Sequence, residues 1–243
     1  MTDEELRRRA TSFGRVANVY ERARPGYPRE AALWLAGDAR RVVDLGAGTG
    51  KLTRELVALG YDVVAVEPLR EMAEQLSSAV PGAVAIEGSA EAIPLLDGSA
   101  DAVVAGQAFH WFDAPVALAE IGRVLRPGGM LGLVWNARDD TEPWVAGLSE
   151  LIGSESEWDH SAPPEIAESA LYGEVEGELF RHAQQLDRRS LVELVSSRSF
   201  TATMDPDERS DLLDRVGRLY DEAAGVGGLV LPYVTYAFRA RKL

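Results

Sequence analysis

Three glycines at alternate positions, Gly46, Gly48 and Gly50, follow a short apolar segment that contains Asp44. Because glycine has no Cβ and accepts positive φ angles, such a loop lets a ligand lie against bare backbone. A helix is predicted over 51–59, and its first N–H groups would point toward the same place. The pattern therefore indicates a ligand-binding loop between a strand and a helix.

A second group that could do chemistry is Glu67, which ends the next predicted strand after Asp44. A carboxylate at this place can accept hydrogen bonds from the hydroxyls of a ribose that carries no 2′-phosphate. Dinucleotide-binding proteins have the pattern G-x-G-x-x-G, whereas this loop is G-x-G-x-G with Lys51 where the third glycine would stand. The spacing thus disfavours a pyrophosphate.

The elements that must position these groups alternate along the chain from residue 41 to residue 135. Alternation of apolar strands with amphipathic helices predicts an α/β fold with a doubly wound, mostly parallel sheet. The predicted strands are 42–45, 62–67, 84–86, 100–105, 130–135, 180–186 and 229–241. The predicted helices that follow the glycine loop are 51–59, 69–79, 115–125, 189–196 and 207–223.

We expect one domain made of four parts. Residues 1–37 form an N-terminal helical lid, and residues 38–136 form the cofactor-binding core. Residues 137–178, which show no repeat, form an insertion or cap. Residues 179–243 complete the sheet.

Composition limits the partners. The net charge of −14 disfavours nucleic acid and anionic membranes. Residues 1–41 hold nine arginines and six acidic residues, a local charge of +3, which keeps RNA as a weaker alternative. The chain has no cysteine, and its histidines lie in none of the usual metal spacings, so neither thiolate chemistry nor a metal site is predicted. No apolar leader or span is recognisable, which predicts a cytoplasmic protein.

Polar and aromatic residues also follow the fourth predicted strand. His110 has a side chain of near-neutral pKa, so it is a candidate general base or a group that orients a substrate. A purely structural hydrogen bond is the alternative. Trp111 is a candidate pocket residue. Tyr20, Arg24 and Tyr27, near the two prolines of the N-terminal segment, could close over the glycine loop.

These residues resemble the class I S-adenosylmethionine-dependent methyltransferases, in particular the type-11, small-molecule-like branch. Four segments carry the resemblance over about residues 40–135: VDLGAGTG at 43–50, VEP at 66–68, GSAEAIP at 88–94 and LRPGG at 125–129. The resemblance implies a Rossmann-like seven-stranded sheet. It also implies methyl transfer to an unidentified small-molecule acceptor by in-line displacement at the sulfonium methyl.

Transferred residue by residue, the resemblance implies a cofactor site for S-adenosylmethionine. Gly46, Ala47 and Gly48 would contact its methionine part, Asp44 would hold its ammonium, and Glu67 would hold its ribose hydroxyls.

The same resemblance places the remaining contacts at the ends of other strands. Pro68 would lie against the adenine, Ala90 would donate its N–H to the ring, and Ser89 would accept from the amino group. Gln107 would face the methionine end and the transferred methyl. Apart from the resemblance, Tyr20 is a candidate cofactor-binding residue because it could close over the cofactor from the N-terminal segment.

Two other functions are weighed against methyl transfer. An NAD-dependent oxidoreductase is disfavoured by Lys51 and by the lack of a catalytic Tyr-x-x-x-Lys pair. A non-catalytic S-adenosylmethionine-binding or partner protein keeps the same cofactor residues and stays open.

Overall fold

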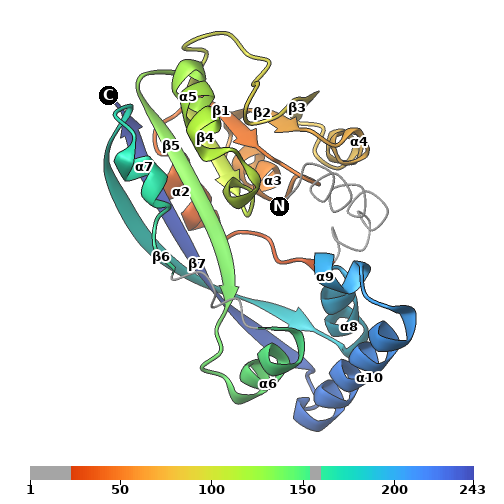
Figure 1. Cartoon of the computed structure of the whole chain (residues 1–243). Coiled ribbons are helices and arrows are strands. Elements are labelled where there is room, and N and C mark those ends of the chain that lie inside the picture. The colour runs from red at the N-terminus through yellow and green to blue at the C-terminus, as the bar shows by residue number, and fades with distance from the viewer. Residues whose placement is uncertain (1–22, 154–159) are drawn as a thin grey trace. The chain divides into compact units, whose positions relative to one another are not determined.

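The computed structural model describes residues 23–153 and 160–243 (Figure 1). Tyr20 and most of the predicted N-terminal lid lie outside the described residues. The described chain forms two compact units. The first holds residues 23–25, 137–153 and 181–234, and the second holds Gly26–Asn136, His160–Phe180 and Thr235–Leu243.

The sheet has seven strands in the order β3-β2-β1-β4-β5-β7-β6 (Figure 1). The strands are β1 (Arg41–Leu45), β2 (Asp62–Glu67), β3 (Ala83–Glu87), β4 (Ala100–Gly106), β5 (Leu125–Arg138), β6 (Tyr172–Leu186) and β7 (Leu229–Lys242). All four ladders from β3 to β5 are parallel. The chain winds outward in both directions from β1 and β4, and β7 runs opposite to its neighbours. The predicted doubly wound, mostly parallel sheet is therefore confirmed.

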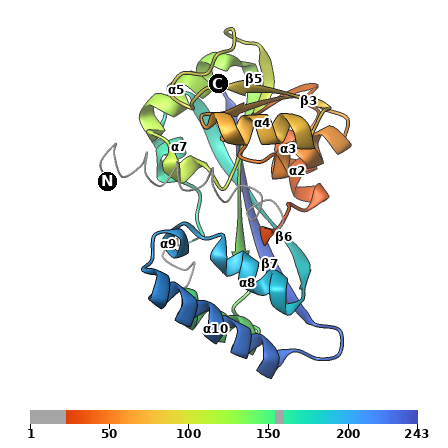
Figure 2. The same cartoon turned by 90° about the vertical axis from the view of Figure 1, so that its right-hand side faces the viewer.

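Helices cover both faces of the parallel part of the sheet. They are α2 (Arg29–Ala36), α3 (Lys51–Ala58), α4 (Arg70–Ala79), η1 (Phe109–Trp111), α5 (Ala114–Val124) and α7 (Pro164–Glu168). α2 and α3 pack their buried leucines on residues such as Val42 and Val104, while α5 and α7 lie on the opposite face (Figure 2). Strands buried on both faces need near-continuous apolar sequence, which β1 and β2 have.

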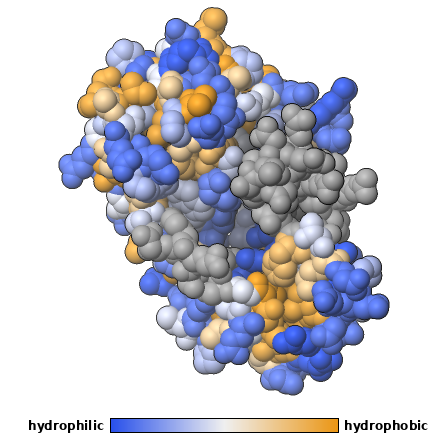
Figure 3. All heavy atoms as spheres, viewed as in Figure 1, coloured by the Kyte–Doolittle hydropathy of each residue, from blue (hydrophilic) through white to orange (hydrophobic). Residues whose placement is uncertain are grey.

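The first unit has its own core. It contains α6 (Pro143–Ile152), α8 (Arg188–Ser196), α9 (Ser199–Ala202) and α10 (Pro206–Ala223). Leu148, Leu191 and Val216, one from each of the longer helices, are fully buried together with Leu231 of β7. Figure 3 shows apolar residues gathered over α8 and α9 and further apolar residues on the surface of the second unit.

Two strands are longer than their sequence predicted. β5 begins at Leu125 rather than at residue 130, because residues 126–129 form a bulge at which the register with β4 shifts. β6 begins at Tyr172 rather than at residue 180 and occupies the end of the sheet, where most of its side chains are exposed. The region 137–178 thus contains α6, α7 and part of β6. The predicted four-part division of the chain stays a prediction.

Candidate active site

The switch point of the sheet lies between β1 and β4, which are neighbours although β2 and β3 separate them in sequence. In open α/β sheets the carboxyl ends of the strands at such a point form a crevice that binds ligands. The glycine loop follows β1 here, and Gln107 follows β4. The fold therefore brings the glycine loop and Gln107 to the same edge of the sheet.

The three loop glycines serve different purposes. Their φ angles are +67° at Gly46, +56° at Gly48 and +90° at Gly50, in a region that favours glycine. A Cβ on Gly46 would lie 2.8 Å from the Cβ of Ala108, and one on Gly50 would lie 2.9 Å from Leu76. A Cβ on Gly48 would meet nothing within 4 Å. Gly46 and Gly50 are thus needed for packing, whereas Gly48 borders open space that a ligand can fill. The expectation that all three glycines let a ligand lie against bare backbone stays a prediction, and the open surroundings of Gly48 agree with it.

Glu67 is tied to the loop by its carboxylate. Its Oε2 accepts from the Gly48 N–H at 2.8 Å and its Oε1 from the Leu69 N–H at 3.0 Å. Each carboxylate oxygen has further lone-pair capacity for a ligand hydroxyl. The side chain is buried, and this burial raises the pKa of Glu67 despite the two hydrogen bonds. The bonds hold the carboxylate in one orientation beside the open face of Gly48.

Asp44 lies in the interior at the end of β1, only 1% exposed. Burial raises its pKa to about 7, the Thr53 hydroxyl that donates to its Oδ2 at 2.5 Å opposes the rise, and the charge of Glu67 adds to it. Two neighbouring acids that burial makes hard to ionise form an environment suited to a cation. Thr53 was not predicted as a site residue, although it lies on the first turn of the helix after the loop.

Gln107 is a strained residue at the end of β4. Its φ is +55°, which costs a non-glycine residue free energy and is found preferentially at functional sites. The side-chain Nε2 donates to the carbonyl of Asn136 at 2.9 Å. Asn136, itself buried, accepts from Thr235 at 2.7 Å and donates to the carbonyl of Gly26 at 2.9 Å. The network joins the ends of β4 and β5 to β7 and to the segment before α2.

Tyr27 reaches the end of β4, whereas Arg24 has another environment. The Tyr27 hydroxyl lies 2.7 Å from where a Cβ on Gly106 would be, so the absence of that Cβ makes room for the ring. Arg24 belongs to the first unit, where its Nε donates to Ser197 Oγ at 3.2 Å. The structure thus places Tyr27 near the switch point. The predicted roles of Tyr27 and Arg24 in a lid stay predictions.

The residues predicted to contact adenine follow β2 and β3. Pro68 is exposed at the end of β2, and Ala90 is buried. Ser89 is half-buried and pairs with Ala92 in an isolated bridge. The neighbouring Glu91 accepts from the N–H of Asp113, the residue that caps α5. The contacts predicted for Pro68, Ser89 and Ala90 stay predictions.

His110 and Trp111 lie in η1, directly after β4. His110 is exposed as a residue, yet the surrounding protein desolvates its ring and lowers its pKa. Trp135 Nε1 donates to His110 Nδ1 at 3.4 Å, and the Trp111 ring is tilted at 45° with its centroid 5.0 Å away. Both residues follow the same strand as Gln107, as the sequence predicted.

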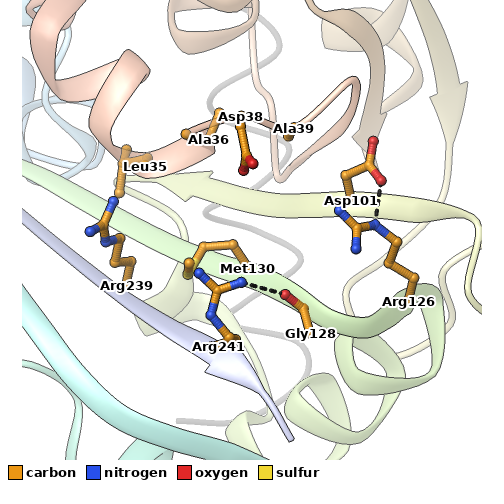
Figure 4. A pocket seen from close by; sticks show the side chains of 11 residues that line it. Leu35, Ala36, Asp38, Ala39, Asp101, Arg126, Gly128, Met130, Arg239 and Arg241 are labelled. Carbon is orange, nitrogen blue, oxygen red and sulfur yellow. Dashed lines mark hydrogen bonds and ion pairs between the residues drawn. The ribbon is translucent and has the colours of Figure 1, made fainter.

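A small hollow lies elsewhere on the second unit, near the start of β1 (Figure 4). The sticks show Arg126 paired with Asp101 and Arg241 bonded to the Gly128 carbonyl along one side. Asp101 also accepts from the N–H groups of Arg40 and Arg41, at the beginning of β1. The hollow therefore belongs to the amino ends of the strands and contains none of the predicted site residues.

Comparison with known protein sequences identifies relatives of this chain. The family described as a methyltransferase domain matches residues 43–133. An uncharacterized methyltransferase of Mycobacterium tuberculosis is 48% identical over 94% of this chain and 95% of its own length. One from Schizosaccharomyces pombe is 34% identical over 92% of this chain and 94% of its own length.

A solved structure shows the same fold at lower identity. It is a protein from Anaeromyxobacter dehalogenans, provisionally described as a Type II methyltransferase. It is 23% identical, has a TM-score of 0.67, and matches over 90% of this chain and 97% of its own.

The sheet, the glycine loop and the buried acidic pair define a ligand-binding α/β protein of the Rossmann-like type. The chain belongs to the methyltransferase family. The predicted family, the fold and the class of enzyme, an S-adenosylmethionine-dependent methyltransferase, are thereby confirmed. The part of the chain that the structure describes contains no helix long and apolar enough to cross a membrane.

Proposed function

We propose that the chain binds S-adenosylmethionine at the carboxyl ends of β1, β2 and β4 and methylates a small-molecule acceptor by in-line displacement. The observation that carries the proposal is the buried pair Asp44 and Glu67 beside the open face of Gly48. The ligand is a sulfonium cation that carries no phosphate. A site lined by carboxylates therefore suits this ligand better than it suits a dinucleotide, whose phosphates are negatively charged.

The chain's own residues supply binding and orientation. Asp44 would accept from the ammonium of the methionine part, and Glu67 would use its remaining lone pairs for the ribose hydroxyls. Ala47 would border the methionine part. Pro68, Ala90 and Ser89 would border the adenine.

The chemistry needs alignment more than activation. When bound, the cofactor supplies a methyl group on a sulfonium that is already a good leaving group. The protein must hold the acceptor behind that methyl in a dry site, and such positioning can account for much of the acceleration. Gln107, whose side chain donates to the Asn136 carbonyl, would border the methyl. Tyr27 and Trp111 lie at the same strand, where an acceptor would enter.

We further propose that the methyl acceptor is a small molecule and that the protein acts in the cytoplasm. The net charge of −14 argues against a polyanionic acceptor such as nucleic acid.

Titration calorimetry tests the choice of ligand directly. S-adenosylmethionine and S-adenosylhomocysteine are expected to bind with one site per chain, and NAD is expected to give no heat above dilution. NAD binding without S-adenosylhomocysteine binding would refute the proposal. Binding without methyl transfer to any acceptor would favour the non-catalytic alternative.

Substituting Gly48 by Ala tests the open face of the loop. The change costs about 1–2 kcal/mol of stability because of the positive φ, and it places a methyl group where the ligand would lie. We expect S-adenosylhomocysteine affinity to fall at least about tenfold, or about 1.4 kcal/mol. Gly60→Ala is the matched control, since Gly60 has φ +92° and equally open surroundings at the end of α3. Equal loss of affinity in both variants would show that only stability was measured.

A further inference from the structure

One ring nitrogen of His110, Nδ1, has a hydrogen-bond partner in the described part of the chain. Nδ1 accepts from Trp135 Nε1 at 3.4 Å. Among the described residues, the hydrogen bond found for the His110 ring is this one at Nδ1. An indole N–H can only donate, so Nδ1 must carry a lone pair rather than a proton whenever this bond is made.

The charge state of the ring follows from its surroundings. Desolvation lowers the pKa of His110, which keeps the imidazole neutral at pH 7. A neutral imidazole with an unprotonated Nδ1 carries its single proton on Nε2. The other nitrogen, Nε2, is then an N–H group. In this state it donates a hydrogen bond and has no lone pair with which to take a proton.

The ring stands in an aromatic setting. The Trp111 ring lies beside the His110 ring. The Trp135 ring in turn contacts the ring of Phe238 in β7, and the centroids of these two rings are 6.2 Å apart at an angle of 60°. Trp111 and Phe238 are both partly accessible. Partly exposed rings next to a polar group suit a ligand with a flat or apolar body.

We propose that Trp135 holds His110 as a hydrogen-bond donor through Nε2, and that the acceptor is a flat, apolar molecule bearing a hydrogen-bond-accepting oxygen. The inference rests on the proposed function for the identity of the acceptor site. It makes His110 a group that orients the acceptor, in place of the general base that the sequence also allowed.

Nitrogen-15 NMR of the protein without ligand tests the donor state. His110 is assigned by comparison with His110→Gln. At pH 7.5 we expect a single tautomer, with Nε2 protonated and Nδ1 not. The Trp135 indole N–H resonance should move in step with the titration of His110, and that movement should be absent in His110→Gln. A protonated Nδ1, or a Trp135 resonance that ignores the titration, would overturn the proposal.

Two aromatic variants separate the hydrogen bond from general packing. Trp135→Phe removes the donor and is expected to let the second tautomer become detectable, whereas Trp111→Phe is expected to leave the tautomer unchanged. Thermal unfolding of both variants reports whether they fold. An identical tautomer signal in folded Trp135→Phe and wild type would refute the role of Trp135. None of these measurements depends on cofactor binding, so failure of the proposed function would show separately in calorimetry.

The acceptor class is tested with fragments in the presence of S-adenosylhomocysteine. Benzoate, which combines a ring with accepting oxygens, is expected to shift the His110 Nε2–H resonance, while benzylamine is not. His110→Gln retains a side-chain N–H donor and should bind benzoate more tightly than His110→Ala does. A response to benzylamine alone, or to neither fragment at millimolar concentrations, would overturn the assigned class.

Discussion

Replacing Glu67 by Ala is expected to weaken S-adenosylhomocysteine binding by roughly 10- to 150-fold, equivalent to about 1.5–3 kcal/mol. Hydrogen bonds from ribose hydroxyls to a charged, buried carboxylate lie in this range. The variant also removes the acceptor for the N–H groups of Gly48 and Leu69, so the loop loses part of its support. Calorimetry gives the affinity, and thermal unfolding gives the accompanying loss of stability.

Glu87→Ala is the matched control for this substitution. Glu87 lies directly opposite Glu67 in the parallel register of β2 and β3, and its side chain is exposed. The substitution Glu87→Ala removes one carboxylate from the neighbouring strand and leaves the glycine loop unchanged. We expect its affinity to stay within about twofold of wild type. Undiminished binding by Glu67→Ala would mean that Glu67 does not contact the ribose.

The affinity for S-adenosylmethionine is expected to fall steeply as the pH drops below 7. Free Asp44 has a pKa of about 7, and an ammonium partner favours the ionised carboxylate. Binding below that pH must therefore release a proton, which costs on the order of tenfold in affinity per pH unit. Calorimetry between pH 5.5 and 7.5 measures the slope. A flat profile would show that Asp44 does not face the ammonium.

Asp44→Asn is the control for this pH dependence. We expect it to raise the stability of the protein and to weaken S-adenosylmethionine binding. A folded-state pKa above the unfolded value of about 3.9 means that stability is greatest below that value and is lost as pH rises toward 7. Asn carries no charge, so the variant should be more stable than wild type at pH 8 by a few kcal/mol. Asp44→Asn should also bind S-adenosylmethionine more weakly, and its affinity should not depend on pH in this range.

Thr53→Val should shift the pH dependence of the affinity to higher pH. It removes the hydroxyl that donates to Asp44 and favours the ionised carboxylate.

The parallel core was predictable because its strands carry a strong local signal. β1 and β2 are short, apolar and buried on both faces, and each is followed by a helix with a distinct polar face. β6 lacks that signal. It contains two glycines and several glutamates, and it is held at the end of the sheet by its pairing with β7, a long-range contact. The start of β5 was missed because its Pro-Gly-Gly segment also fits a turn.

The candidate site was predictable to the extent that its residues end strands. Asp44, Glu67 and Gln107 all occupy such positions. What the sequence could not provide were the partners of these side chains. The bonds from Asn136 to Gly26 and from Thr235 to Asn136 join residues about a hundred positions apart, and no local pattern marks them. The separate roles of Gly46 and Gly48 also depend on what lies opposite each glycine.

The contact between Gly46 and Ala108 bears on how this enzyme could be re-engineered. Ala108 and Phe112 fill the space beside Gly46, so the loop after β4 is anchored to the loop after β1 at these two positions. His110 and Trp111 lie between the anchors and project from the same short helix. A library for new acceptors should therefore randomise positions 110 and 111 and retain Ala108 and Phe112. Diversity would then be confined to the two residues that we propose to border the acceptor, and the cofactor loop would stay intact.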